Sequence, residues 1–378
     1  MPKSIYLHIP FCEHICYYCD FNKVFLKKQP VDEYLSSMRT ELSLLMETYQ
    51  PNEIQTIFVG GGTPTSLNEK QLAFFCQSIR DILPYSNGEF TFEANPGDLS
   101  ESKLRVLKEY GVNRISLGVQ SFNEEMLKKI GRTHTPHDVF TSIEKAKNVG
   151  FDNISIDLIY SLPEQTLNDF QQTLHTALSL ELPHYSAYSL IIEPKTIFYN
   201  LIQKGKLALP PEETEARMYE WLMEEMDKNG IYQYEISNFA RPGFESQHNL
   251  VYWNNEEYFG AGAGAHSYVQ GVRRSNYGPL KKYMAPLEQR RFPIYTEHHV
   301  TKKEQMEEEM FLGLRKTKGV SIARFTERYG VSPLDCFSHV IEELIQKELI
   351  EVVQDTIRLT KEGKLLGNVV FQSFLGEI

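Results

Sequence analysis

The first two-thirds of this 378-residue chain alternate short β-branched or aromatic segments with longer amphipathic ones, and this alternation restricts the fold more than any other feature. Strictly alternating strands and helices form βαβ units, in which consecutive strands run parallel. Six such units without an early dinucleotide-binding fingerprint favour an α/β fold, a partial (β/α)6 barrel of the TIM type, over a doubly wound sheet. The expected strands are 4–9, 55–59, 90–94, 114–119, 153–159 and 185–191, and the expected helices are 31–49, 68–83, 100–110, 136–149, 166–180 and 211–229.

The alternation stops after about residue 285, and a smaller unit follows. Its expected elements are a charged helix over 301–318, two shorter helices at 322–325 and 333–347, strands at 350–353 and 356–359, and a last helix. This order is typical of a winged-helix-like α+β domain, so we predict two domains, 1–285 and 286–378. Winged helices often bind DNA, but residues 300–378 hold 11 basic and 13 acidic side chains, which favours packing or partner contact instead.

Charge and cysteine content narrow the class of protein further. Lys and Arg number 39 against 50 Asp and Glu, a net charge of −11, which argues against nucleic acid as a partner. Five cysteines, an odd number, do not make a disulfide framework, and Cys76 and Cys336 stand alone in helical segments as ordinary packing residues. No signal peptide is apparent, and no run of about 18 apolar residues predicts a transmembrane segment. We expect a cytoplasmic protein.

The other three cysteines fall into one loop directly after the first strand, as Cys12-x-x-x-Cys16-x-x-Cys19. Thiolates at this spacing select zinc or an iron–sulfur cluster. A structural zinc site, with His8 or His14 as the fourth ligand, is one interpretation. Such sites usually combine two separated ligand pairs, and no second pair follows here. The spacing therefore favours an iron–sulfur cluster, in which three protein ligands leave one iron open to an outside ligand.

Polar residues follow several of the expected strands, at the ends where a (β/α) barrel builds its active centre. Glycines there allow the backbone to lie against a ligand. A carboxylate can hold ribose hydroxyls, and an arginine can pair with a carboxylate through two parallel hydrogen bonds. A helix cap, a turn or a solvated surface residue is the alternative for any one of them, but together they favour a polar ligand beside the cysteine loop. The segments concerned are Gly60-Gly61-Gly62-Thr63-Pro64-Thr65, Glu93-Ala94-Asn95-Pro96, Gln120-Ser121-Phe122 and Asp157-Leu158-Ile159, together with Arg132.

The cysteine spacing, set between Tyr6-x-His8-x-Pro10-Phe11-Cys12 and Tyr17-Tyr18-Cys19, resembles the radical S-adenosylmethionine superfamily. From Tyr6 to about Tyr283 the motifs are similar to its oxygen-independent coproporphyrinogen III oxidase-like branch. The resemblance implies a [4Fe–4S] cluster on Cys12, Cys16 and Cys19, S-adenosyl-L-methionine on the fourth iron, and an electron donor for the cluster. It implies S-adenosylmethionine contacts by Tyr6, Gly61, Gly62, Thr63, Glu93, Gln120, Arg132 and Asp157, and weaker ones by Tyr18 and Ile191.

Two groups within this branch differ just after the cysteine motif. Coproporphyrinogen dehydrogenases carry a fourth cysteine two positions after the third, and an N-terminal extension. This chain has Phe21 at that position, and its motif begins at residue 12. Both departures match the haem chaperones of the branch, as does the segment His248-Asn249-Leu250-Val251-Tyr252-Trp253. That resemblance implies haem contacts by His248, Asn249, Tyr252 and Trp253, since imidazole ligates haem iron and aromatic rings stack on a porphyrin. The alternative is a hydrogen-bonded histidine beside core aromatic residues.

The resemblance therefore implies a chaperone that binds haem and passes it to haem-receiving client proteins, and it assigns no catalytic residue. Two rival functions stay open, the oxidative decarboxylation of coproporphyrinogen III propionates and a structural zinc protein. The run Gly260-Ala261-Gly262-Ala263-Gly264-Ala265 invites comparison with a nucleotide-binding loop, but no βαβ context follows it, and close backbone packing is favoured. His266, next in the chain, is a secondary candidate near the haem or cofactor.

Overall fold

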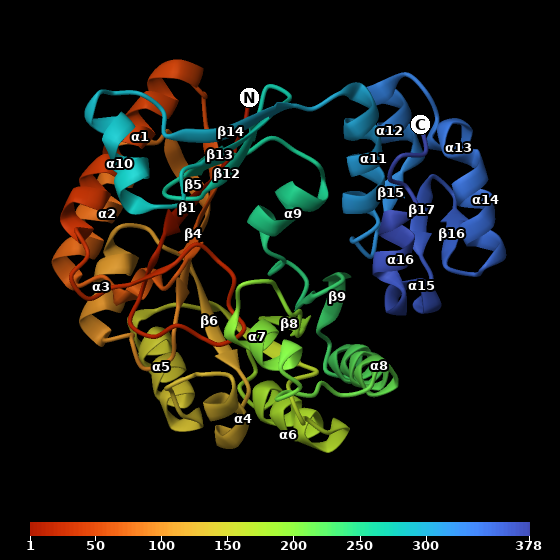
Figure 1. Ribbon diagram of the computed structural model, residues 1–378, viewed down its shortest axis with the longest axis horizontal. Helices are drawn as coiled ribbons and strands as arrows, with labels where there is room; N and C mark the ends of the chain where they lie inside the picture. The colour runs from red at the N-terminus through yellow and green to blue at the C-terminus, as the bar shows by residue number, and fades with distance from the viewer.

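The computed structural model describes all residues, Met1–Ile378. Its main sheet has nine strands in the order β11-β1-β4-β5-β6-β7-β8-β10-β9 (Figure 1). The six predicted strands form its centre and run parallel, each hydrogen-bonded to the next, so the predicted α/β partial barrel is confirmed. They are β1 (Ser4–Ile9), β4 (Ile54–Gly61), β5 (Tyr85–Ala94), β6 (Arg114–Gln120), β7 (Asn153–Tyr160) and β8 (His184–Ser189).

Six long helices cover the outside of this sheet (Figure 1). They are α1 (Val31–Tyr49), α2 (Glu69–Ile82), α3 (Glu101–Glu109), α5 (Pro136–Val149), α6 (Leu167–Leu178) and α8 (Glu212–Lys228). Their starts follow the sequence closely because capping boxes at Asn68, Thr135 and Thr166 satisfy the first backbone N–H groups. The short helices η1 (Pro64–Ser66), α4 (Glu124–Lys129) and α7 (Ile197–Gln203) were not predicted.

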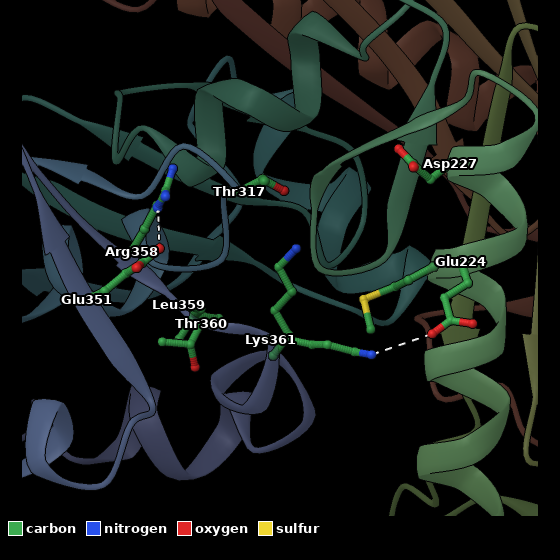
Figure 2. A pocket seen from close by; sticks show the side chains of 10 residues that line it. Glu224, Asp227, Thr317, Glu351, Arg358, Leu359, Thr360 and Lys361 are labelled. Atoms are coloured by element: carbon green, nitrogen blue, oxygen red, sulfur yellow. Dashed lines mark hydrogen bonds and ion pairs between the residues drawn. The ribbon is translucent and has the colours of Figure 1, made fainter.

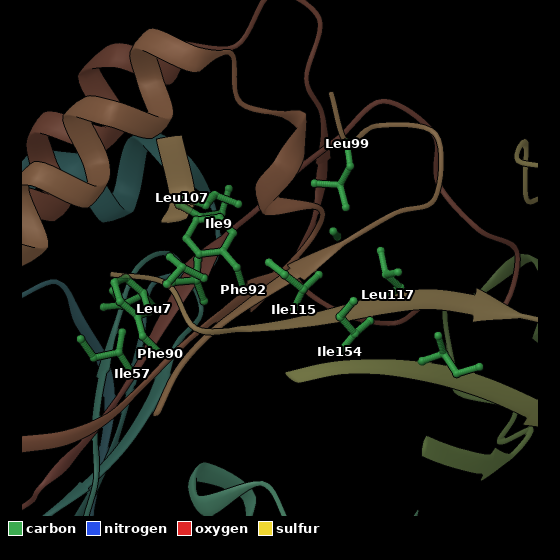
Figure 3. Packing of buried hydrophobic residues seen from close by; sticks show 14 of the residues in the cluster. Leu7, Ile9, Ile57, Phe90, Phe92, Leu99, Leu107, Ile115, Leu117 and Ile154 are labelled. Atoms are coloured by element: carbon green, nitrogen blue, oxygen red, sulfur yellow. The ribbon is translucent and has the colours of Figure 1, made fainter. Parts of the chain in front are cut away.

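The two faces of the barrel strands differ in character because successive side chains point to opposite sides. The outer face is apolar and packs under the helices, as Figure 3 shows for Ile57, Phe90, Ile115 and Ile154 from four neighbouring strands. The alternate residues point into the barrel, and many of them are polar. The apolar outer face stabilises the fold, which leaves the polar inner face available for a ligand.

Three short strands extend the sheet at its edges, and none was predicted. β11 (Phe259–Ala261) runs parallel to β1, while β10 (Asn238–Ala240) pairs antiparallel with both β8 and β9 (Tyr232–Glu235). The short helix α9 (Gln247–Trp253) lies between these edges and contacts β4 from the inside of the barrel (Figure 1). The edges and α9 together narrow the open side of the partial barrel.

The predicted division at 285/286 is misplaced. It falls inside α10 (Leu280–Glu288), which packs against α1 of the barrel. β14 (Ile294–His299), also unpredicted, pairs with β13 (Val272–Asn276), which in turn pairs with β12 (His266–Val269). The second hydrophobic core begins only at Met306. The structural division therefore lies near residue 300, after the three-stranded sheet.

The C-terminal unit has its own core of 17 buried residues and the predicted order of helices followed by a β-hairpin. The helix expected over 301–318 ends at Gly313, and the one expected over 333–347 is broken at Phe337. A short strand, β15, joins the hairpin as a third strand. The elements are α11 (Lys302–Gly313), β15 (Val320–Ser321), α12 (Ile322–Tyr329), α13 (Pro333–Cys336), α14 (Ser338–Gln346), β16 (Ile350–Val353), β17 (Thr356–Leu359), α15 (Lys361–Leu365) and α16 (Gly367–Gln372).

The C-terminal unit meets the barrel across a cavity of about 450 Å³ between α8 and the β16–β17 hairpin. Figure 2 shows Lys361 reaching across it to Glu224 of α8, with an Nζ to Oε1 distance of 3.5 Å. Arg358 and Glu351 pair within the hairpin at 2.8 Å. Both pairs are exposed and contribute little to stability, so the cavity is a solvated seam between the two units. None of the helices combines the length and apolar character that crossing a membrane requires.

Candidate metal centre and ligand site

The cysteine loop is held at both ends by a small parallel ladder. β2 (Phe11–Cys12) pairs with β3 (Val24–Phe25), and Leu26 N donates to Cys12 O at 2.8 Å. Cys12 is buried, while Cys16 and Cys19 are half-buried, and all three are free thiols. The ladder therefore closes the loop so that its three cysteines lie at the carboxyl end of β1.

The three thiols lie close together in a partly buried environment. Burial raises the pKa of Cys12 to about 11, against the hydrogen bond from Thr63 Oγ1 at 3.7 Å. The neighbouring thiols raise it further, so the three lie close together. Zinc needs four ligands about one ion, whereas each thiolate of a [4Fe–4S] cluster binds a different iron.

His8 does not serve as a fourth zinc ligand here. Its Nε2 donates to Asn22 O at 2.7 Å, and its Nδ1 accepts from the Tyr6 hydroxyl at 3.0 Å. Both ring nitrogens are occupied, and the ring is 5% exposed. His14 lies exposed in the loop. The donor set thus comprises three thiolates, which fits a cluster with one open iron.

The glycine run after β4 packs directly on the cysteine loop. Gly62 N donates to Ile9 O at 2.8 Å, and a Cβ at residue 62 would lie 3.0 Å from Cys12 Sγ and 2.7 Å from Phe11 O. Any side chain here would push the loop away. Gly61 and Thr63, also predicted, flank this contact. The run therefore positions the cluster loop, in addition to any role toward a ligand.

Three predicted residues meet on the inner face of the barrel. Glu93 Oε2 accepts from Gly61 N at 3.1 Å. Burial and, next, the Asp157 carboxylate raise the pKa of Glu93 to about 8, opposed by the Gly61 N–H and Arg114. Burial likewise raises the pKa of Asp157, which accepts from Ser116 Oγ at 3.2 Å. Two buried carboxyl groups on the inner face of a barrel can provide a site for a cationic ligand.

Arg132 joins the strand ends to the cysteine loop. Its Nη1 lies 3.5 Å from Cys16 Sγ, and its Nη2 donates to Gly118 O and, at 2.9 Å, to Asn95 Oδ1. Its Nε is buried without a hydrogen-bond partner, so it can donate to an acceptor atom of a bound ligand. Gln120, at the end of β6, has a φ of +67°, a strained backbone geometry that clusters at ligand sites.

Asn95 is a site residue that the sequence prediction left out. Its Nδ2 donates to Thr63 Oγ1 at 2.9 Å, and its Oδ1 accepts from Arg132, so it links two predicted residues. The available signal was its position in Glu93-Ala94-Asn95-Pro96, directly after a buried strand. Tyr18 is half-buried beside the loop, whereas Ile191 is 66% exposed and lies beyond the end of β8 at Ser189. The strand predicted to reach residue 191 therefore ends two residues earlier, at Ser189.

The predicted haem motif forms α9, and it divides into two environments. His248 is fully buried against β4, with Nδ1 2.8 Å from Thr56 Oγ1 and Nε2 2.8 Å from the Tyr252 hydroxyl. Burial lowers the pKa of His248 to about 3, so the ring is neutral. Trp253 points instead to the C-terminal unit, where the Arg315 guanidinium lies 4.7 Å from its ring. Asn249 contributes its backbone N–H to the Ser246 cap.

A glutamate of β5 fixes α9 in this position. Glu89 accepts from Ser246 Oγ at 3.0 Å and from the backbone N–H groups of Gln247 and His248 at 2.8 and 3.2 Å. These contacts satisfy the first N–H groups of the helix with an anion, which is the favourable charge at a helix N-terminus. The imidazole of His248 is thus presented to Thr56 and Tyr252, and its binding of iron would first require release of one of these bonds.

The glycine run over 260–265 is a packing element, as predicted. Gly262 has a φ of +107°, and its Cβ would lie 2.6 Å from His8 O, so only glycine fits. Its N–H donates to Glu41 Oε2 at 2.8 Å. Asn22 of the cysteine loop donates to Ala263 O and Gly278 O at 2.8 and 3.0 Å. His266 follows as an exposed residue at the start of β12.

Asn22→Ala is expected to loosen the cysteine loop. It removes two hydrogen bonds of the loop, one to Ala263 O of the glycine run and one to Gly278 O, each contributing about 1 kcal/mol. We expect the purified iron-loaded variant to lose iron to a chelator at least about tenfold faster than wild type. Asn229→Ala, which removes one exposed hydrogen bond to Glu225 O, is the matched control. Equal rates of iron release in all three proteins would contradict this role of Asn22.

Comparison with known proteins adds three findings. Residues 6–177 match the radical SAM superfamily, and residues 300–366 match the HemN C-terminal domain. The chain is 56% identical over 379 residues to the heme chaperone HemW of Bacillus subtilis (strain 168), covering 100% of both, and 33% identical over 383 residues to that of Escherichia coli (strain K12), covering 100% and 99%. The solved coproporphyrinogen III oxidase HemN of Escherichia coli superposes with a TM-score of 0.87 at 24% identity, over 100% of this chain and 91% of that one.

Proposed function

Since the chain belongs to the radical SAM superfamily and, within it, to the family of the heme chaperones HemW, we propose that it binds haem and delivers it to client proteins. The observation that carries this proposal is the 56% identity to a heme chaperone over the full length of both chains. Phe21, 64% exposed, stands where the coproporphyrinogen dehydrogenases carry a further cysteine. The likeness to HemN, at 24% identity, extends to the fold alone.

Cys12, Cys16 and Cys19 are proposed to hold a [4Fe–4S] cluster, with S-adenosylmethionine at the open iron. Such a cluster supplies one-electron chemistry when bound. Arg132, whose Nε lacks a partner beside Cys16, is suited to take the carboxylate of S-adenosylmethionine. Glu93 and Asp157 are suited to its ammonium or ribose groups. Tyr6, Gly61, Gly62, Thr63 and Gln120 are proposed to line the same site, with weaker contacts from Tyr18 and Ile191.

His248, Asn249, Tyr252 and Trp253 are proposed to contribute to the haem site. The proposed partners are haem-receiving client proteins and an electron donor for the cluster, with no role for nucleic acid. We place the protein in the cytoplasm, where reduced thiols persist. The net charge of −11 supports a contact role for the C-terminal unit over a DNA-binding one.

Affinity for S-adenosylmethionine is expected to rise with pH. The free Glu93 carboxyl has a pKa of about 8, and a ligand with sulfonium and ammonium charges stabilises its ionised form. Below pH 8 binding must displace a proton, so affinity falls by up to about tenfold per pH unit, and above pH 8 it levels off. Titration calorimetry between pH 6 and 9 measures this. Glu93→Gln should flatten the pH dependence of S-adenosylmethionine affinity, whereas the exposed Glu109→Gln should leave it unchanged. A steep pH dependence in Glu93→Gln would contradict the role of the Glu93 carboxyl.

A haem-transfer assay tests the proposed function. Purified protein is incubated with haem, freed of excess haem by gel filtration, and mixed with an apo-haemoprotein whose Soret band reports loading. We expect co-elution of haem with the chain and transfer to the acceptor. Absence of a spectral shift and of co-elution would refute the proposal. An anaerobic incubation of reconstituted protein with coproporphyrinogen III and a strong reductant accompanies it, and robust conversion would favour the dehydrogenase.

A further inference from the structure

One buried charge in the barrel has no partner. Arg114, the first residue of β6, is 2% exposed, and its Nε is buried without any hydrogen bond. Arg114 takes part in none of the ion pairs of the structure, which means that no carboxylate oxygen lies within 4.0 Å of its guanidinium nitrogens. Buried glutamates, by contrast, have polar partners. Glu41 accepts hydrogen bonds from three donors, and Glu309 forms an ion pair with Arg328 at 2.7 Å. A buried unpaired guanidinium is costly, which marks Arg114 as unusual.

The strand register places this guanidinium inside the barrel. Arg114 lies opposite Thr91 on one side and Asn153 on the other, in the row that also contains Phe58. The His248 ring packs on Phe58, with ring centroids 5.3 Å apart. Arg114 therefore lies at the amino end of the strands, at the level of α9 and its haem motif.

The groups around Arg114 form no ion pair with it. His184 and His248 are neutral because burial lowers the pKa of both rings. The Tyr234 hydroxyl is engaged by His184 Nε2 at 2.9 Å and by Ser246 N at 3.2 Å. Glu93 and Asp157 are the nearest acids, and burial raises the pKa of each, that of Glu93 to about 8. An additional anion is therefore favourable beside Arg114.

The length of β6 separates this position from the proposed S-adenosylmethionine carboxylate. Arg114 and Gln120 stand at opposite ends of a seven-residue strand, about 20 Å apart at about 3.3 Å per residue. Arg132, next to Cys16, lies at the far end with the cluster loop. A carboxylate held by Arg132 is therefore distinct from one held by Arg114, which lies in the row of Phe58 and α9.

We propose that Arg114 is a carboxylate-binding residue in the barrel, and that in the loaded protein it pairs with a propionate of haem. The inference rests on the proposed haem-binding function. Propionates are the only anionic groups of haem, and a planar guanidinium takes a carboxylate through two parallel hydrogen bonds. α9 covers this end of the barrel, so the ligand reaches Arg114 when α9 shifts.

Removing the carboxylates from the ligand tests the proposal directly. Soret titrations compare ferric haem with its neutral dimethyl ester on wild type, Arg114→Gln and Arg114→Lys, with the exposed Arg105→Gln as the control. Wild type and Arg105→Gln should prefer haem over the ester by at least about tenfold. The preference should fall to near unity in Arg114→Gln and be partly retained in Arg114→Lys. An unchanged preference in Arg114→Gln, or equal binding of haem and ester by wild type, would overturn the proposal.

Two further measurements distinguish a propionate contact from a structural role of Arg114 and from a role toward S-adenosylmethionine. Equal losses of haem and ester binding in Arg114→Gln would assign a structural role and overturn the proposal. Titration with S-adenosylmethionine should show a smaller change in Arg114→Gln than the haem preference does, because Arg114 acts on that site only through the charge it presents to Glu93 and Asp157. A large loss of S-adenosylmethionine affinity with the haem preference intact would assign the carboxylate to S-adenosylmethionine instead. If Arg114→Gln fails to fold, the wild-type comparison and Arg114→Lys still decide. Binding of neither porphyrin by wild type would refute the haem function itself, a result distinct from failure to discriminate the ester.

Discussion

Replacing Cys12, Cys16 or Cys19 by alanine, one at a time, is expected to abolish [4Fe–4S] binding. In the proposed cluster each thiolate holds a separate iron, and both nitrogens of His8 are already hydrogen-bonded, so His8 is not free to replace a lost thiolate. Iron and sulfide analysis after anaerobic reconstitution, with the charge-transfer absorbance, measures the effect. The loss should be essentially complete for each variant.

The other two cysteines provide the matched controls. Cys76 is buried within α2, and Cys336 lies in α13 of the C-terminal unit. Cys76→Ala and Cys336→Ala should therefore retain full iron and sulfide. Stoichiometric zinc in aerobically purified wild type, together with failure of the iron reconstitution, would contradict the cluster assignment. Retention of a [4Fe–4S] cluster by Cys16→Ala would show that another residue can replace a thiolate.

Loading of the cluster should also release protons. Burial raises the pKa of the Cys12 thiol to about 11 and also raises that of Cys19, although Lys23 acts against it. In the metal-free protein the Cys12 and Cys19 thiols are therefore protonated near pH 7, and they bind iron as thiolates. Assembly is for this reason expected to become more favourable as the pH rises toward the thiol pKa values.

Most of the fold was predictable because its signals are local. The six parallel strands each carry an apolar outer face, and helix starts such as Thr135 and Thr166 carry capping boxes that are legible in the sequence. β9, β10 and β11 were missed since strands of three or four residues carry too little pattern and depend on pairing with β8 or β1. The domain division failed for the same reason, because β14 belongs to the barrel only through its pairing with β13.

Site residues that lie at strand ends could be predicted from the sequence. Site residues that act through contacts with distant segments of the chain could not. Glu93, Gln120 and Asp157 lie at or near the carboxyl ends of strands, which the alternation locates. Asn22 and Glu89 act on segments more than 150 residues away, on the glycine run and α9 respectively, and no local pattern marks such contacts. Arg114 could likewise not be identified from the sequence, because its burial and its lack of an ion-pair partner depend on the packing of the folded barrel.

The largest effect on haem is expected at His248. His248→Ala removes a fully buried ring and leaves the Thr56 and Tyr252 hydroxyls unpaired, a loss of about 2–5 kcal/mol in the free energy of unfolding. If the ring contributes to the haem site as proposed, haem affinity should fall at least about tenfold. Tyr252→Phe keeps the His248 imidazole and frees its Nε2 from the Tyr252 hydroxyl. This variant should therefore retain haem binding or strengthen it. Denaturant unfolding and Soret titration measure the two quantities.

His184 separates the loss of a ligand group from the loss of a buried histidine. It is also fully buried, with Nδ1 2.7 Å from Ser155 Oγ and Nε2 2.9 Å from the Tyr234 hydroxyl, so His184→Ala creates a comparable cavity and leaves two comparable hydroxyls unpaired. Its stability loss should match that of His248→Ala, while haem affinity should fall by less than in His248→Ala, because His184 lies near Arg114 but outside the haem motif. Parallel losses of haem affinity in both variants would make His248 a scaffold residue. A fall confined to His248→Ala, with binding intact in Tyr252→Phe, would place the imidazole in contact with the haem, because stability alone would then no longer account for the difference.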